Sequence, residues 1–166
     1  MVVMPGYYDP NYIHPPDGCH YTADHVKQLD RLAKSKHGKP VVVISHGPPK
    51  YEGPDGLDVI HNGDNVGDSA LSALITGNGI GFGIFGHILE AGGRGVDKAG
   101  KAVAPNTKVK QLYVNAGSAS AIPWRMRDES INRGMAMLLT IDRYGATYKV
   151  LNAESMWASG NVRAAQ

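Results

Sequence analysis

Short apolar runs that end at a glycine or a polar residue recur along the chain and predict the strands of a buried sheet. Val41–Ser45 and Ile80–Phe85 have the length and the aliphatic or aromatic content of buried strands. Lys108–Asn115 predicts a third such strand, and a further strand begins at Met1. Near-continuous apolar runs of this kind are typical of a sheet that is covered on both faces.

Two segments between these runs have helical periodicity. Thr22–Ala33 predicts an amphipathic helix, with Thr22 as its N-cap and Gly38 at its end. Asp68–Ile75 predicts a short helix that Gly77 closes, and this helix leads back to the next strand as a β-α-β unit. The apolar face of the first helix is formed by Val26, Leu29, Leu32 and Ala33.

The C-terminal part predicts a hairpin. Its strands are Met135–Ile141 and Ala146–Leu151, joined by a turn at Asp142–Gly145. The stretches Ala91–Val103 and Pro123–Asp128 are expected to be loops, the first a mobile arm over the site. The predicted fold class is α/β in layers, with one domain over residues 1–151 and a peripheral tail over residues 152–166.

Composition narrows the class of protein. With 166 residues, 42% hydrophobic and 19% charged, the chain is expected to be one soluble globular domain. A formal charge of +2 with no basic run gives no reason to expect nucleic acid, and no apolar stretch reaches the length of a membrane span. The single cysteine, Cys19, excludes an internal disulfide, so the cytoplasm is the expected location.

The candidate chemistry lies at two strand ends. His46 follows the run Val41–Ser45, and His87 follows Gly86 at the end of the next apolar run. Histidine is a common metal ligand, and side chains at the carboxyl ends of sheet strands gather in active sites. We therefore expect His46 and His87 to be two ligands of one metal. The alternative is two loop histidines that never meet.

Other polar groups are weaker candidates. The long loop Gly47–Asn65 holds Asp55, Asp58, His61 and Asp64, which are expected to be solvated unless they supply ligands. His14, His20 and His25 form a local group whose spacing fits no closed zinc site. The glycine pattern Gly81–Gly86 lies inside a strand, so it does not predict a dinucleotide site.

Three motifs, in this order and strand context, resemble the C-terminal half of a calcineurin-like metallophosphoesterase. They are Ser45-His46-Gly-Pro-Pro, Gly86-His87-Ile-Leu89 in place of Gly-His-x-His, and Asn115-Ala-Gly-Ser118 in place of Asn-Pro-Gly-Ser. The resemblance covers about Val41 to Leu151. It implies a β-sandwich flanked by helices, present here as a half or truncated form.

The resemblance also implies a site. His46 and His87 would be metal ligands, and the turn Asn115, Gly117 and Ser118 would bind substrate through its floor of backbone N–H groups. The implied cofactor is a divalent ion such as manganese, zinc or iron. Gly6–Asp9 occupies about the place of the family's Gly-Asn-His-Asp, with Tyr7 and Tyr8 replacing its Asn and His. The alternative is an ordinary Pro/Gly turn.

Departures from the family limit the expected activity. Leu89 stands where the second histidine ligand would be, and the Asp-x-His and Gly-Asp-x-x-Asp-Arg motifs of the family's N-terminal half are absent from the sequence. Either a second polypeptide supplies these groups or the chain is inactive. Exposed strand edges would favour a homo-oligomer or another partner. The leading hypothesis is a phosphoester hydrolase module with a partial metal site, and the alternative is a non-catalytic module that binds protein or ligand.

Overall fold

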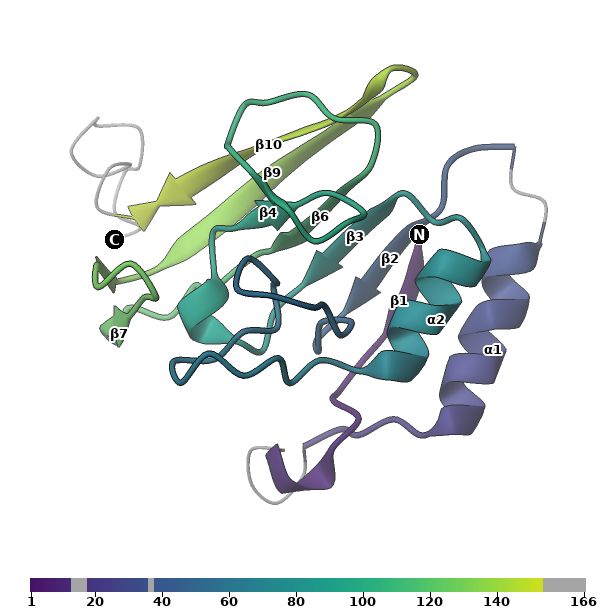
Figure 1. Cartoon of the computed structure of the whole chain (residues 1–166), viewed down its shortest axis with the longest axis horizontal. Coiled ribbons are helices and arrows are strands. Elements are labelled where there is room, and N and C mark those ends of the chain that lie inside the picture. Colours follow the sequence, from purple (N-terminus) through teal and green to yellow (C-terminus); the bar gives the residue numbers. More distant parts are fainter. Residues whose placement is uncertain (13–17, 36–37, 154–166) are drawn as a thin grey trace, which may run out of the picture.

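The computed structural model describes residues 1–12, 18–35 and 38–153. Within these residues a six-stranded sheet forms the centre, in the order β1-β2-β3-β6-β4-β5 (Figure 1). Its first four strands are parallel to one another, and β4 runs antiparallel to both of its neighbours, β6 and β5. The strands are β1 (Val2–Met4), β2 (Val42–Ser45), β3 (Phe82–Phe85), β6 (Leu112–Asn115), β4 (Gly95–Val96) and β5 (Ala102–Val103).

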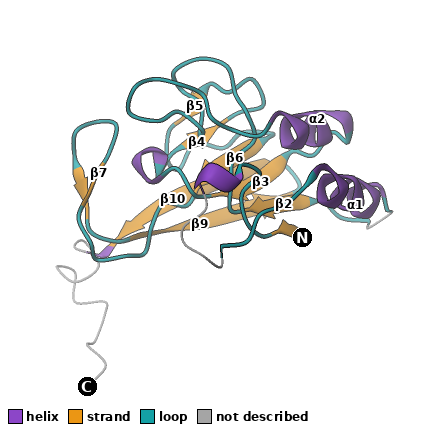
Figure 2. Cartoon of the chain, turned by 90° about the horizontal axis from the view of Figure 1, so that it is seen from below, coloured by secondary structure: helices purple, strands orange, loops and turns teal. Residues whose placement is uncertain are grey.

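The sheet lies between two other layers. Helices α1 (Ala23–Lys34) and α2 (Ser69–Gly77) cover one side, and a hairpin of β9 (Met135–Asp142) and β10 (Gly145–Asn152) lies on the other (Figure 2). A smaller hairpin joins β7 (Trp124–Arg125) to β8 (Ile131–Asn132). Two single-turn 3₁₀ helices, η1 (Pro10–Tyr12) and η2 (Leu89–Ala91), complete the elements.

Alternation along the parallel strands explains why both layers are needed. Val43, Phe85 and Tyr113 belong to the core under the helices, whereas Phe82 and Leu112 belong to the core under the β9–β10 hairpin. Side chains on a strand point to opposite faces in turn, so each strand contributes to both cores. The near-continuous apolar runs of the sequence follow directly from this arrangement.

The helices were predicted correctly in place and less well in detail. Thr22 is the N-cap of α1, and its backbone N–H donates to Nδ1 of His25 at 3.0 Å. Asp68 is the N-cap of α2 and accepts from the N–H of Ala70. The prediction that Gly38 ends α1 is wrong, because the helix stops at Lys34. Leu32 is also 57% exposed instead of lining the buried face.

Two predicted loops contain short strands. The stretch Ala91–Val103 holds β4 and β5, which add to the sheet, so it is not a mobile arm. The stretch Pro123–Asp128 holds β7. The predicted hairpin is confirmed, and Asn152, assigned to the tail, pairs with Met135 at the end of β10. Ala153, also assigned to the tail, donates its N–H to the carbonyl of Gly134, and residues 154–166 lie outside the described residues.

The chain is therefore a mixed α/β protein with a layered arrangement of sheets and helices. The parallel order β1-β2-β3-β6 places the carboxyl ends of four strands at one edge of the central sheet. In the described ranges, no helix is both long enough and apolar enough to cross a membrane.

Candidate functional site: a histidine pair at the edge of the sheet

Two histidines from separate strand ends meet at the carboxyl edge of the sheet. His46 follows β2 directly, and His87 follows β3 after Gly86. Since β2 and β3 are adjacent and parallel, both side chains start from the same edge. Nε2 of His46 lies 3.0 Å from Nδ1 of His87, and the two rings meet edge to face. The expected juxtaposition is therefore present.

The backbone around His87 is fixed in an unusual conformation. His87 has a φ of 64°, in the left-handed region that residues with a β-carbon seldom adopt. The N–H of Gly86 donates to the carbonyl of His46 at 3.0 Å, and the N–H of Ile88 donates to the carbonyl of Gly86 at 2.7 Å. The first bond ties the two histidine segments together, and the second closes the turn at His87. The turn thus directs the His87 ring toward His46 at a cost in backbone strain.

Tyr7 supports the other side of the pair. It follows β1, is buried, and stacks on the ring of His87 with 3.9 Å between ring centroids. Its hydroxyl donates to the carbonyl of Val66 at 2.6 Å, and burial raises the pKa of this phenol well above its usual value. In the weak match to Gly-Asn-His-Asp, Tyr7 replaced a metal-binding residue. In space it packs against one of the candidate ligands.

Asn115 holds the loop behind the pair. Its side chain is fully buried at the end of β6, and Nδ2 donates to the carbonyl of Ile88 at 2.9 Å. Its Oδ1 accepts from the N–H of Gly117 at 2.9 Å. The substrate-binding role expected of Asn115 and Gly117 stays a prediction; in this structure the Asn115 side chain is buried and the N–H of Gly117 already has an acceptor. The hydroxyl of Ser118 accepts a hydrogen bond from the N–H of Ser120, and its carbonyl accepts one from the N–H of Met135.

The described residues supply only two candidate ligands to this site. Among residues 1–12, 18–35 and 38–153, no group of three His, Cys, Asp or Glu side chains is placed to hold a metal ion. Asp58, expected to be solvated, is fully buried and accepts from the N–H groups of Tyr51 and Gly67. It therefore organises the long loop after β2. His14 lies outside the described residues.

Two further residues lie near His87. Leu89, which stands where the resemblance places a second histidine ligand, begins the 3₁₀ helix η2. Arg94 lies in the predicted loop Ala91–Val103, where an exposed basic residue is the default expectation and contact with a phosphate is the alternative. It is half-buried between η2 and β4, and its Nη1 is completely enclosed.

Sequence reasoning missed the residues that position the pair. The sequence alone indicated that Tyr7 is a replaced ligand or part of an ordinary turn, and that Asp58 is a solvated carboxylate or a ligand. Tyr7 comes after a strand and before a proline-rich stretch, a pattern that gives no indication of contact with a histidine 80 positions later. The sequence feature that reflects this contact is Gly47, because a β-carbon there would lie 2.3 Å from Cδ2 of Tyr7. The sequence has 21 glycines, and nothing in it distinguishes Gly47 from the others.

The pair can act chemically in two ways. Two imidazole nitrogens can bind one divalent ion and leave its other positions to water or a substrate. Without an ion, one ring donates to the other and the pair can pass a proton. Comparisons of the chain with protein-family models, curated proteins and solved structures found no match.

Proposed function

We propose that this chain is a metallophosphoesterase-like module in which His46 and His87 bind one divalent metal ion. The single observation that supports this most is the 3.0 Å approach of their nitrogens at the carboxyl edge of the sheet. Zinc binds histidine nitrogen at about 2.0–2.1 Å, so two ligands in tetrahedral geometry lie about 3.3 Å apart. Binding of an ion would move the nitrogens apart from 3.0 Å, displace the proton between them and turn both lone pairs toward the ion.

The proposed activity as a phosphoester hydrolase is weak or absent in the isolated chain. Efficient hydrolysis of this kind uses two ions about 3.5–4 Å apart, which hold the attacking water between them. The described residues place no third His, Cys, Asp or Glu side chain with the pair. An ion held by two imidazoles can still contact a phosphate oxygen, so binding of a phosphoester is expected to exceed turnover.

A partner that completes the module is part of the proposal. Within the described sheet, β1 has a neighbour only on its β2 side, and Val3 on β1 is 60% exposed. Leu138 on the outer face of β9 is 54% exposed. Unpaired edges and apolar positions of this kind favour association, either with a second copy or with a chain that carries the missing ligands. Sedimentation velocity, with Val3→Lys as the test variant, distinguishes a dimer from a monomer.

The second candidate function is a non-catalytic module that binds protein or ligand. One observation favours it. Nδ1 of His87 already has a hydrogen-bonding partner in His46, and the His87 ring is stacked on Tyr7. A pair satisfied in this way is stable without an ion.

Calorimetric titration with zinc and with manganese tests the proposal. We expect one ion per chain in the wild type, and affinity lowered about tenfold or more in His46→Ala and in His87→Ala. His61→Ala, which removes another exposed imidazole, is the matched control and should bind as the wild type does. No saturable binding by the wild type would favour the non-catalytic module. Rapid hydrolysis of p-nitrophenyl phosphate that His87→Ala abolishes would show that the site is more complete than proposed.

A further inference from the structure

The layer formed by the β9–β10 hairpin covers only part of the central sheet. Val114, Ile84, Ile44 and Val3 are register neighbours across β6, β3, β2 and β1, so their side chains share one face of the sheet. Ile84 and Val114 place this face under the hairpin. Val114 is fully buried, Ile84 and Ile44 are partly buried, and Val3 is 60% exposed. Exposure therefore rises toward β1, where the hairpin layer no longer covers the sheet.

The edge of β9 that faces away from β10 has no neighbouring strand in the described part of the chain. In an antiparallel pair, the N–H and C=O groups of alternate residues point away from the partner strand. Ala146 on β10 makes both of its backbone hydrogen bonds with Val109, so its register neighbour Ile141 directs its own N–H and C=O to the free edge of β9. By the same alternation, Leu139 and Met137 also direct their backbone groups to this edge.

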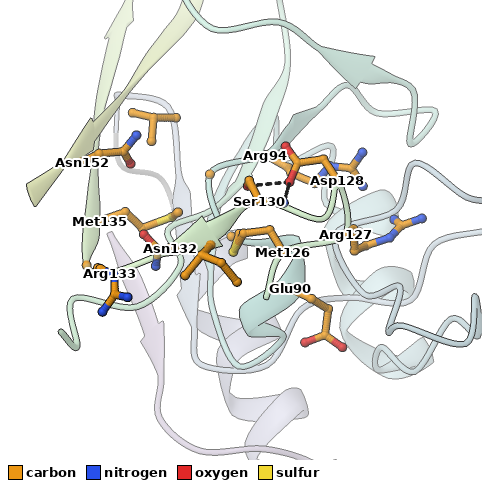
Figure 3. Close-up of a pocket in the computed structure, with 15 residues that line it drawn as sticks. Glu90, Arg94, Met126, Arg127, Asp128, Ser130, Asn132, Arg133, Met135 and Asn152 are labelled. Carbon is orange, nitrogen blue, oxygen red and sulfur yellow. Dashed lines mark hydrogen bonds between the residues drawn. The ribbon is translucent and has the colours of Figure 1, made fainter. Parts of the chain in front are cut away.

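Met135 closes the amino end of this edge. Its N–H donates to the carbonyl of Ser118 at 2.8 Å, and Figure 3 shows its side chain at the cavity beside the β7–β8 hairpin. The free part of the edge is therefore Met137–Ile141, which spans about 17 Å at about 3.4 Å per residue. This segment contains no charged residue and no proline, the residues that commonly protect an edge strand from pairing.

We propose that an extended segment of a partner polypeptide adds to this edge of β9 as a further strand and covers Ile44 and Val3. The added strand lies about 4.8 Å from β9, and its backbone pairs with Met137, Leu139 and Ile141. Its side chains alternate between the uncovered apolar row and solvent, so the partner segment has about five or six residues, apolar at every second position. This inference deepens the partner part of the proposed function and needs no metal ion.

A second copy of the chain fits this edge less well than a separate segment. Antiparallel pairing of two β9 edges about a twofold axis places both central sheets on the same side of the joined hairpins. Because β1 and β2 of each copy extend past β9, the two pairs of strands would overlap. A single extended segment meets no such obstacle.

The test is fluorescence anisotropy in EDTA with a labelled peptide that has the sequence of β10, Gly145–Asn152, because this strand already pairs with the other edge of β9. We expect saturable binding, and none by a peptide with the same residues in an order without alternation. Val3→Lys should weaken binding about tenfold or more, because it places a charge under the added strand. Leu139→Pro, which removes one outward N–H, should do the same. Leu32→Lys makes the same kind of change at a similarly exposed position of α1, on the helix side, and should leave binding unchanged.

Amide hydrogen exchange of the full chain locates the added strand. The amides of Leu139 and Ile141 should exchange rapidly in the free protein and slowly with the peptide bound. The inference is overturned if the peptide does not bind saturably, if the reordered peptide binds equally well, or if Val3→Lys and Leu139→Pro both bind with wild-type affinity. Slow exchange of these amides in the free monomer also overturns it, because the edge is then already covered. Protection that rises with protein concentration in the absence of peptide identifies a second copy as the occupant and overturns the proposed partner. None of these outcomes depends on the metal titration, so the two proposals fail separately.

Discussion

His87 combines the chemistry of the site with the strain that positions it. Its φ of 64° costs energy that a glycine at the same place would avoid. The hydrogen bonds of Gly86 and Ile88 and the stacked ring of Tyr7 hold it there. Asn106 and Glu129 have a similar φ, but His87 is the member of this group that lies in the candidate site.

Substitutions at His87 separate stability from metal binding. His87→Gly should be about 1 kcal/mol more stable than His87→Ala, since both remove the ring and only alanine keeps the left-handed strain. Both variants should lose metal affinity to the same extent. Urea unfolding of the two proteins, with zinc titration of each, measures the two effects. Equal stability of the glycine and alanine variants would contradict the strained conformation.

At the scale of elements, the loops that follow β1 and β2 pack against each other beside the histidine pair. Tyr7 follows β1 and Gly47 follows β2 by two positions, and the ring of Tyr7 occupies the space that a side chain at 47 would need. The absence of a β-carbon at Gly47 thus lets the stacked Tyr7 ring reach His87. The contact depends on two loops, not on a regular element.

A pair of glycine substitutions tests this packing. Gly47→Ala would place a carbon 2.3 Å from Cδ2 of Tyr7, so we expect a loss of about 1–3 kcal/mol of stability and a weaker metal site. Gly86→Ala is the matched control, because its nearest neighbour is the carbonyl oxygen of His46 at an ordinary 3.6 Å. Chemical denaturation measures both. If the two variants lose the same free energy of unfolding, the Tyr7 ring can move away from residue 47 at little cost, which contradicts the tight packing.

The elements that the sequence predicts are those with local causes. The strands β2, β3 and β6 follow from apolar runs, and the pairing of His46 with His87 follows from strands that end at a common edge. β4 and β5 have two residues each, and their pairing with β6 depends on long-range contacts. The sequence also could not predict that Asn115 holds the loop behind the pair. Its hydrogen-bonding partners are backbone carbonyls, one of them in a distant loop, and backbone groups are the same for every residue type.

At the scale of the whole molecule, buried tyrosines link stability to pH. Burial raises the pKa of Tyr7, Tyr21 and Tyr51, and raises that of Tyr113 to about 12, from an ordinary value of 10.0. Tyr21 also donates to Asp68 at 2.8 Å, which raises its pKa further. Below pH 10 both states keep these protons and stability is unaffected. Above it, the unfolded chain releases protons that the folded chain retains.

The fold should therefore lose stability between pH 10 and 12. Each retained proton contributes a slope of about 1.4 kcal/mol per pH unit. Tyr21→Phe removes one such group, so its stability should fall less steeply with pH than that of the wild type. Tyr144→Phe, at an exposed position, should not change the slope. Urea unfolding at several alkaline pH values gives these slopes, and an unaltered slope in Tyr21→Phe would contradict the linkage.

The central claim is that His46 and His87 together bind one metal ion. Anomalous diffraction from crystals grown with zinc, recorded on both sides of the zinc absorption edge, tests it most directly. The account predicts one anomalous peak about 2.0–2.1 Å from both Nε2 of His46 and Nδ1 of His87, with the nitrogens moved apart from 3.0 Å. Zinc bound elsewhere in the crystal, with the two rings still hydrogen-bonded to each other, would contradict it.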